Sequence, residues 1–375
     1  MKRVVFFITY TMAKPIVGGS FFRALRLAME MTRRGWHPII ANWGPVLDDP
    51  KVSEANDSVQ FVPLDRNQPG LTLQILKQEF SRLNPALVVM GETPFKAMEL
   101  FYGAAKRLLR PFVVLDQFYS HELLPPKEGV DLILLYGLKS FWRDDLHLEP
   151  PYEIVPPFIE RVTPKSDLPV PEELYDRRWI TLVAYDDYVC KRGFDLLSRL
   201  EDRQTALIAI TRNPESCRQI ARSRGVDSGR LVTLPLQCDA TVFGFMAASA
   251  VTLVSNGFLQ IMEALALASP IIALERGDGV GMNAFNIAKR FEPYVSFEHS
   301  VEEQLSCMTR WLQMSPISPE LRARLDLERH GLVICANRIE AVYRDWQTES
   351  KWRRTARRWW EHLLRIADYS GTLTI

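Results

Sequence analysis

The sequence predicts an α/β protein of two doubly wound parallel-sheet domains that face each other across a cleft. Short apolar runs alternate with amphipathic stretches along both halves of the chain, which is typical of a parallel sheet covered by helices. A proline-rich stretch separates the halves, and 375 residues are enough for two domains with a core each. We therefore expect domains at residues 1–150 and 176–330, a linker at 151–175, and C-terminal helices at 331–375 that cross back to the first domain.

The composition indicates a globular protein with no global attraction to nucleic acid or to anionic membranes. Hydrophobic residues make up 47% of the chain, charged residues 24%, and the formal net charge is +1. The five cysteines are widely spaced and form no C-x-x-C pair, which indicates free thiols in a reducing compartment. The N-terminal run has no cleavage site of the small-x-small type, so we expect a first strand there and a cytoplasmic protein.

The first half contains six predicted strands and three clear helices. The strands are expected at Val4–Thr9, Pro38–Asn42, Val59–Pro63, Leu87–Met90, Phe112–Leu115 and Leu132–Leu135, and the helices at Phe21–Arg34, Leu73–Leu83 and Lys96–Leu109. Seven prolines between Pro150 and Pro171 then favour a stiff linker without a regular element.

The alternation restarts after the linker and predicts the second domain. The elements are expected, in chain order, as strand Trp179–Ala184, helix Phe194–Leu200, strand Leu207–Ile210, helix Pro214–Arg224, strand Leu231–Leu234, helix Ala240–Ala247, strand Val251–Val254, helix Phe258–Leu267 and strand Pro270–Leu274. The last three form the most apolar segment of the chain. Its length would suffice for a membrane span, but a glycine turn, Pro270 and the lone charge of Glu263 favour strand, turn, helix and strand.

Three loops that follow strands are candidates for binding, because ligands of parallel sheets bind at the carboxyl ends of the strands. Gly18 and Gly19, with Ser20, precede the first helix, although a tight turn alone would also explain two glycines. Lys191 and Arg192 are expected just before a helix, where they would contact phosphate or simply face solvent. In the third loop, the backbone of Asn256, Gly257 and Phe258 precedes a helix that carries Glu263.

The buried position expected for Glu263 requires hydrogen-bond donors, because an unpaired buried carboxylate is costly. The two vicinal hydroxyls of a ribose would satisfy it as a carboxylate. Nothing in the chain matches G-x-G-x-x-G or a P-loop, which disfavours nicotinamide and P-loop nucleotide chemistry.

The stretch Leu231–Phe291 resembles the donor half of glycosyltransferases with two Rossmann-like domains, the GT-B fold. Within them it is most similar to the inverting N-acetylglucosaminyltransferases that make the lipid intermediate of peptidoglycan. The resemblance lies in Asn256-Gly257, Glu263, Ser269-Pro270, the strand Ile271–Leu274 and Asn283-Ala284. It implies a UDP-sugar donor with its ribose on Glu263, its pyrophosphate at residues 256–258 and near Lys191 and Arg192, and an acceptor loop at residues 18–20.

The resemblance also implies candidates for the sugar and for the catalytic base. Asp278 and Asn283 are candidates for the donor sugar. An inverting transfer needs a base for the acceptor hydroxyl, and His121 or Asp116, after the fifth strand, could provide it. The chain departs from the family in two places, because no histidine follows the glycine loop and no glutamine precedes Asn283. A nucleotide-sugar epimerase or hydrolase, or a non-catalytic binding protein, therefore stays open as an alternative.

No metal or separate cofactor is expected, because the chain has no D-x-D motif and Asp186-Asp187 lack partners at a metal-binding spacing. The C-terminal stretch "SKWRRTARRWWEHLLRIADY" places Trp352 and Trp359 on one helical face and most arginines elsewhere. We interpret it as a helix that packs its tryptophans on the first domain, with peripheral contact to an anionic membrane as the alternative.

Overall fold

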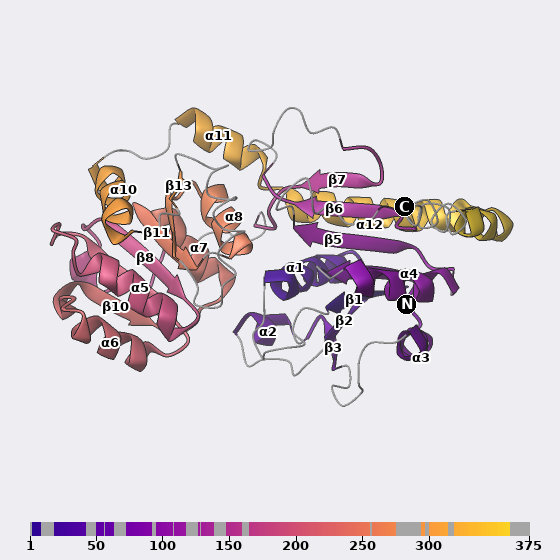
Figure 1. Ribbon diagram of the computed structural model, residues 1–375, viewed down its shortest axis with the longest axis horizontal. Helices are drawn as coiled ribbons and strands as arrows, with labels where there is room; N and C mark the ends of the chain where they lie inside the picture. Colours follow the sequence, from indigo (N-terminus) through magenta and orange to yellow (C-terminus); the bar gives the residue numbers. More distant parts are fainter. Residues whose placement is uncertain are drawn as a thin grey trace, which may run out of the picture.

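The computed structural model describes residues 2–8, 19–42, 50–55, 57–63, 73–91, 95–107, 109–117, 127, 129–138, 148–159, 165–255, 257–274, 294–296, 300–313 and 319–360. These residues form two parallel sheets, each flanked by helices, in two domains that lie side by side (Figure 1). The predicted fold class is thereby confirmed.

The first sheet has seven parallel strands in the order β3-β2-β1-β4-β5-β6-β7. The strands are β1 (Lys2–Ile8), β2 (Trp36–Asn42), β3 (Gln60–Pro63), β4 (Leu87–Gly91), β5 (Phe112–Gln117), β6 (Leu132–Tyr136) and β7 (Tyr152–Val155), and the helices between them are α1 (Gly19–Arg33), α2 (Pro50–Ala55), α3 (Leu73–Leu83) and α4 (Phe95–Arg107). Val4 and Phe6 of β1 pack into the core on one face of the sheet, whereas Val5 and Phe7 pack into the core on the other. Burial on both faces explains why these strands are continuous apolar runs.

Strand β7 corrects the prediction that the proline-rich stretch holds no regular element. Its four residues lie between Pro151 and Pro156 and pair with β6 at the edge of the sheet. The prolines lie just outside the strand, where their missing N–H groups leave the strand-to-strand hydrogen bonds intact. The stretch therefore supplies an edge strand first, and the connection between the domains begins only at Pro156.

The second sheet has six parallel strands in the order β10-β9-β8-β11-β12-β13. Its strands are β8 (Trp179–Ala184), β9 (Ala206–Thr211), β10 (Leu231–Leu234), β11 (Val251–Ser255), β12 (Ile271–Leu274) and β13 (Val295–Ser296), and its helices are α5 (Asp187–Leu197), α6 (Pro214–Ser223), α7 (Asp239–Ala248), α8 (Phe258–Ala266) and α10 (Val301–Gln313). The segment from Val251 to Leu274 is strand, turn, helix and strand, as predicted. The two-residue strand β13 was not predicted, because so short a run leaves no periodic signal.

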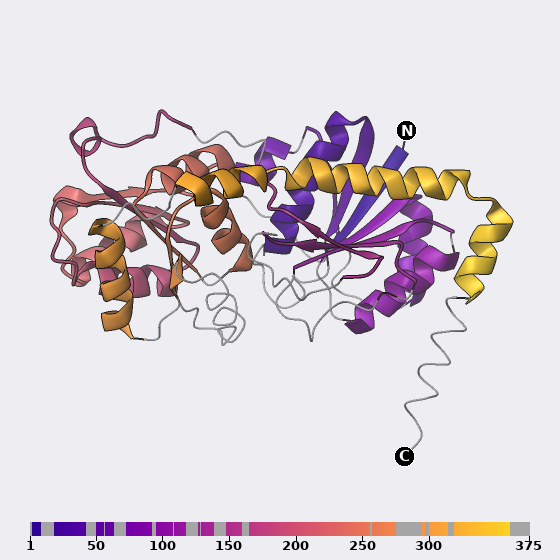
Figure 2. The same cartoon turned by 90° about the horizontal axis from the view of Figure 1, so that it is seen from above.

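Helix α12 (Gly331–Thr348) follows α11 (Pro319–Leu327) and runs along the first domain (Figure 2). The indole N–H of Trp36 donates to Glu340 Oε1 at 3.0 Å, and that of Trp346 donates to the carbonyl of Leu109 at 3.0 Å. The helix therefore belongs to the core of the first domain although it comes after the whole of the second.

All five cysteines are free thiols. Cys190, Cys217 and Cys335 are buried free thiols, whereas Cys238 and Cys307 are only half-buried. Within the described parts of the chain, every helix is too short or too polar to cross a bilayer.

Candidate functional site

The strand order of the second sheet reverses between β8 and β11, and helices α5 and α8 begin at the carboxyl ends of these two strands. Connections leave such a point in opposite directions and open a crevice, which is where open α/β sheets bind ligands. The two helix N-termini at this point differ sharply in charge.

Helix α8 begins with an N-terminus that suits an anion. Gly257 precedes it without a capping side chain, and its first turn contains no acidic residue. The hydroxyl of Ser255 donates to Oε1 of Gln260 at 2.6 Å. Unsatisfied N–H groups and the positive end of the helix dipole together favour a phosphate here.

Helix α5 begins with two carboxylates instead. Oδ1 of Asp186 accepts a hydrogen bond from the backbone N–H of Val189 at 2.8 Å, and Asp187 occupies the first turn. Both groups are exposed and carry the charge that repels a phosphate. This N-terminus is therefore the weaker anion site of the two.

Lys191 and Arg192 lie inside α5 rather than before it, which corrects the predicted helix start at Phe194. The Asp186 cap starts the helix seven residues earlier, at Asp187. The side chain of Lys191 is exposed and that of Arg192 is half-buried. Gly193 has a packing role, since a Cβ there would lie 2.9 Å from two side-chain carbons of Leu182 in β8.

Glu263, the lone carboxylate of the apolar segment, forms an ion pair with the first domain. Its side chain is 4% exposed, and its Oε1 lies 2.5 Å from Nη1 of Arg26 in helix α1. The Nε atom of Arg26 also donates to Oδ2 of Asp239, in α7, at 2.6 Å. One arginine from the first domain thus joins two carboxylates of the second in a buried cluster, which we call the Arg26 cluster.

The Arg26 cluster is enclosed by aromatic rings. The guanidinium carbon of Arg26 lies 5.1 Å from the ring centroid of Phe243, and that of neighbouring Arg23 lies 5.3 Å from that of Tyr136. Burial by itself would lower the pKa of Arg26, but the charges of Asp239 and Glu263 raise it above its usual value. Burial, with the charge of Glu263, raises the pKa of Tyr136, so its hydroxyl stays protonated.

Arg26 was not among the predicted site residues, because the charges of α1 resemble a solvent-facing stripe. Arg23, Arg26 and Glu30 recur at helical spacing and are all buried. Helix α1 contacts α8 of the second domain and α12, which packs on the first domain. Two features of the sequence together could have identified Arg26: a lone acid in the apolar helix α8, and charges at helical spacing among the apolar residues of α1.

The first domain presents some of the remaining candidates at the carboxyl edge of its sheet. Gly19 and Ser20 are the first two residues of α1, which follows β1. Asp116 is half-buried and next to last in β5. The other predicted site residues, Gly18, His121, Asn256, Asp278 and Asn283, lie outside the described residues. Phe258 is the first residue of α8.

A metal site is not evident in the part of the chain that the structure describes, where no group of three or more histidine, cysteine, aspartate or glutamate side chains could hold an ion. The charges that could meet a phosphate there are helix N-termini and basic side chains.

Comparison with known proteins gives solved structures of one fold. The protein superimposes on a glycosyltransferase of Rickettsia africae with a TM-score of 0.56 and 13% identity, covering 93% of this chain and 99% of that one. MurG of Acinetobacter baumannii gives a TM-score of 0.57 at 12% identity, over 91% and 100% of the two chains. A Listeria monocytogenes protein assigned as a UDP-N-acetylglucosamine 2-epimerase gives 0.55 at 16% identity, over 94% and 98%.

By sequence, no family model and no curated protein matches the chain. At these identities the structural likeness establishes the fold, which is the two-domain GT-B fold expected from the sequence.

Proposed function

We propose that the protein is a glycosyltransferase that moves a sugar from a UDP-linked donor to an acceptor hydroxyl with inversion. The observation that carries this proposal is the uncapped, acid-free N-terminus of α8 at the point where the second sheet reverses its strand order. A pyrophosphate at the start of α8, next to Gly257 and Phe258, would meet the first-turn N–H groups and the positive end of the helix dipole. Glycosyltransferases and an enzyme assigned to UDP-sugar epimerisation share this fold, which supports the nucleotide-sugar class.

In the proposed reaction, the acceptor oxygen attacks the anomeric carbon while the bond from that carbon to the β-phosphate oxygen breaks. UDP leaves with the electron pair, and the dipole of α8 stabilises the charge that develops on it. A base takes the proton of the acceptor hydroxyl. Asp116, at the carboxyl end of β5, and His121 remain the candidates for this base.

Glu263 is proposed to accept hydrogen bonds from the ribose hydroxyls. Since Arg26 lies 2.5 Å from its Oε1, the ribose would have to share this carboxylate with Arg26 or displace it. Nucleotide binding would then act directly on the contact that joins the two domains. Lys191 and Arg192 would contribute from the second turn of α5 rather than from its start.

The test compares two variants that each remove one carboxylate of the Arg26 cluster. We expect Glu263→Gln to weaken UDP binding by about 1–3 kcal/mol and to lose the preference for UDP over 2′-deoxy-UDP. Asp239→Asn removes the other partner of Arg26 and should keep that preference, which separates ribose contact from damage to the cluster. Calorimetric titration measures both, and an unchanged preference in Glu263→Gln would exclude the ribose contact.

The reaction itself is tested by mass spectrometry after incubation with a panel of UDP-sugars. A transferase releases UDP faster when an acceptor is present and forms an adduct. The second candidate function, epimerisation, is favoured by the Listeria neighbour and would give an isomerised sugar without an adduct. A binding protein would give neither product.

A further inference from the structure

The helix at residues 351–360 exposes its tryptophans and directs Arg357 and Arg358 toward the first domain, which is the reverse of the expected packing. Trp352, Trp359 and Trp360 are 78%, 59% and 64% exposed, whereas Arg358 is 1% exposed. Successive residues of a helix are rotated by about 100°, so these tryptophans and Ala356 fall within an arc of about 100°. We call this outward arc the tryptophan face.

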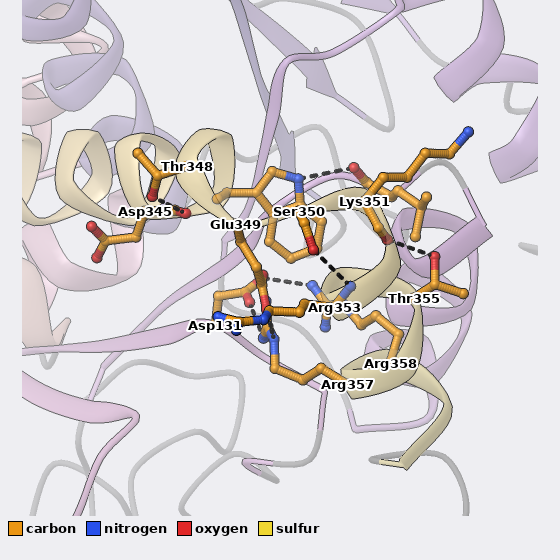
Figure 3. Close-up of polar contacts among 12 residues, drawn as sticks. Asp131, Asp345, Thr348, Glu349, Ser350, Lys351, Arg353, Thr355, Arg357 and Arg358 are labelled. Carbon is orange, nitrogen blue, oxygen red and sulfur yellow. Dashed lines mark hydrogen bonds and ion pairs between the residues drawn. The ribbon is translucent and has the colours of Figure 1, made fainter.

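Two arginines fix the orientation of this helix. Arg358 donates to Oδ2 of Asp131 at 2.6 Å, and Arg357 donates to Oδ1 of the same carboxylate at 2.8 Å (Figure 3). Arg357 also pairs with Glu349 at 3.0 Å, and both guanidinium groups lie about 5 Å from the ring of Trp346. The side chain of Asp131 is only 8% exposed, so these are largely buried contacts that hold the tryptophan face outward.

The tryptophan face lies outside the core of the fold. It brings three largely exposed indoles to one side of a single helix, and clustered exposed apolar side chains on proteins mark interaction surfaces. Nζ of Lys106 lies 4.9 Å from the Trp359 ring and adds a positive charge beside this face.

The charged residues of the helix itself have one sign. Residues 350–360 contain five basic residues and no acidic one. Arg357 and Arg358 are engaged inside, whereas Lys351 and Arg353 are exposed beside the tryptophans, and Lys351 extends away from the inner contacts (Figure 3). The surface that the helix presents is therefore aromatic with a basic border.

We propose that the tryptophan face docks on the surface of an anionic phospholipid bilayer. Indole rings prefer the headgroup region, where the ring meets acyl chains and its N–H meets polar groups, and exposed lysine and arginine attract anionic lipid. The exposed side of a single helix fits a flat lipid surface better than a single-stranded nucleic acid, which binds in basic grooves. Docking does not depend on which reaction the protein catalyses.

The proposal is tested by sedimentation of the full chain with sucrose-loaded vesicles of phosphatidylcholine alone or with a quarter phosphatidylglycerol. We expect the wild type to bind the anionic vesicles and to dissociate in high salt. Trp352→Ala/Trp359→Ala/Trp360→Ala should lower the partition coefficient at least about tenfold, since binding scales with buried apolar area. Lys351→Glu/Arg353→Glu should remove the preference for anionic lipid.

Two controls make the test specific. Leu327→Ala removes an exposed apolar side chain from another part of the molecule and should bind like wild type. All variants change exposed residues and should keep the thermal midpoint of wild type.

Equal vesicle binding by wild type and the tryptophan variant would overturn the proposal, as would no binding by wild type. Two other results would overturn it. One is a wild-type dimer in light scattering that the tryptophan variant does not form. The other is a wild-type protein that binds a single-stranded oligonucleotide but not vesicles.

Discussion

Glu263 shows how a single residue can be predicted correctly in its environment while its observed partner is missed. Its burial and its position in α8 follow from the local sequence, and so does its need for hydrogen-bond donors. Its observed partner, Arg26, lies 237 positions earlier in the chain, in another domain. No local pattern encodes that pairing, because it depends on how the two domains meet.

The Arg26 cluster should make Arg26 one of the most sensitive charged positions of the protein. Arg26→Met leaves the carboxylates of Asp239 and Glu263 buried without their cation, which should lower the free energy of unfolding by about 3–5 kcal/mol. Urea unfolding measures the loss. Adding Asp239→Asn and Glu263→Gln to Arg26→Met removes the uncompensated charges and should recover part of it.

Arg33→Met is the matched control for Arg26→Met. Arg33 lies in the same helix, but its side chain is 49% exposed and its ion pair with Glu30 is 3.6 Å long. Its replacement should cost less than about 1 kcal/mol. Equal losses for the two variants would contradict a structural role of the Arg26 cluster.

At the scale of elements, the sequence predicts most strands and helices closely. It fails where a single capping residue, which is a weak signal, competes with a glycine that resembles a turn. Strands β8 and β10 and helix α3 have the predicted bounds. Helix α5 was predicted to start seven residues late because Gly193 resembled a turn, although Asp186 is a good N-cap. Gly193 is instead required for the close packing of α5 on Leu182.

The start of α12 shows a second close approach that only the structure reveals. A Cβ at Gly331 would lie 1.8 Å from the carbonyl oxygen of Pro156, at the point where the two connections between the domains meet. Gly331→Ala should therefore destabilise the protein by about 1–3 kcal/mol through overpacking, although alanine is the better helix former. Thermal unfolding measures the effect.

Gly229→Ala serves as the control for Gly331→Ala. Its Cβ would lie 3.4 Å from the nearest atom, Oδ1 of the exposed residue Asp227, and the site itself is exposed. It should change the midpoint little. A Gly331→Ala protein as stable as Gly229→Ala would show that Pro156 moves aside freely.

At the scale of the whole molecule, the two domains are not two consecutive segments of the chain. The chain passes from the first domain to the second after β7 and returns with α12, which packs on α1, β6 and β7. The sequence predicts two sheets, but contacts such as Trp36 with Glu340 and Arg26 with Glu263 join segments that are hundreds of residues apart. Apolar packing is likewise continuous from the first sheet through α8 and α12.

This connectivity predicts how the protein responds to a cut between the domains. The N-terminal fragment would lose its covalent link to α12 but keep its contacts, including the ion pair of Arg34 with Glu340 at 2.9 Å and the Trp36 hydrogen bond. A site-specific protease sequence placed in the exposed stretch 171–173 should therefore give two chains that stay together. We expect the cut protein to elute from gel filtration as one species of unchanged size, to show two bands on a denaturing gel, and to separate into two species only in urea. Two folded halves that separate in native buffer would mean that α12 and the Arg26 cluster add little to the union of the domains, and that the proline-rich connection alone holds them together.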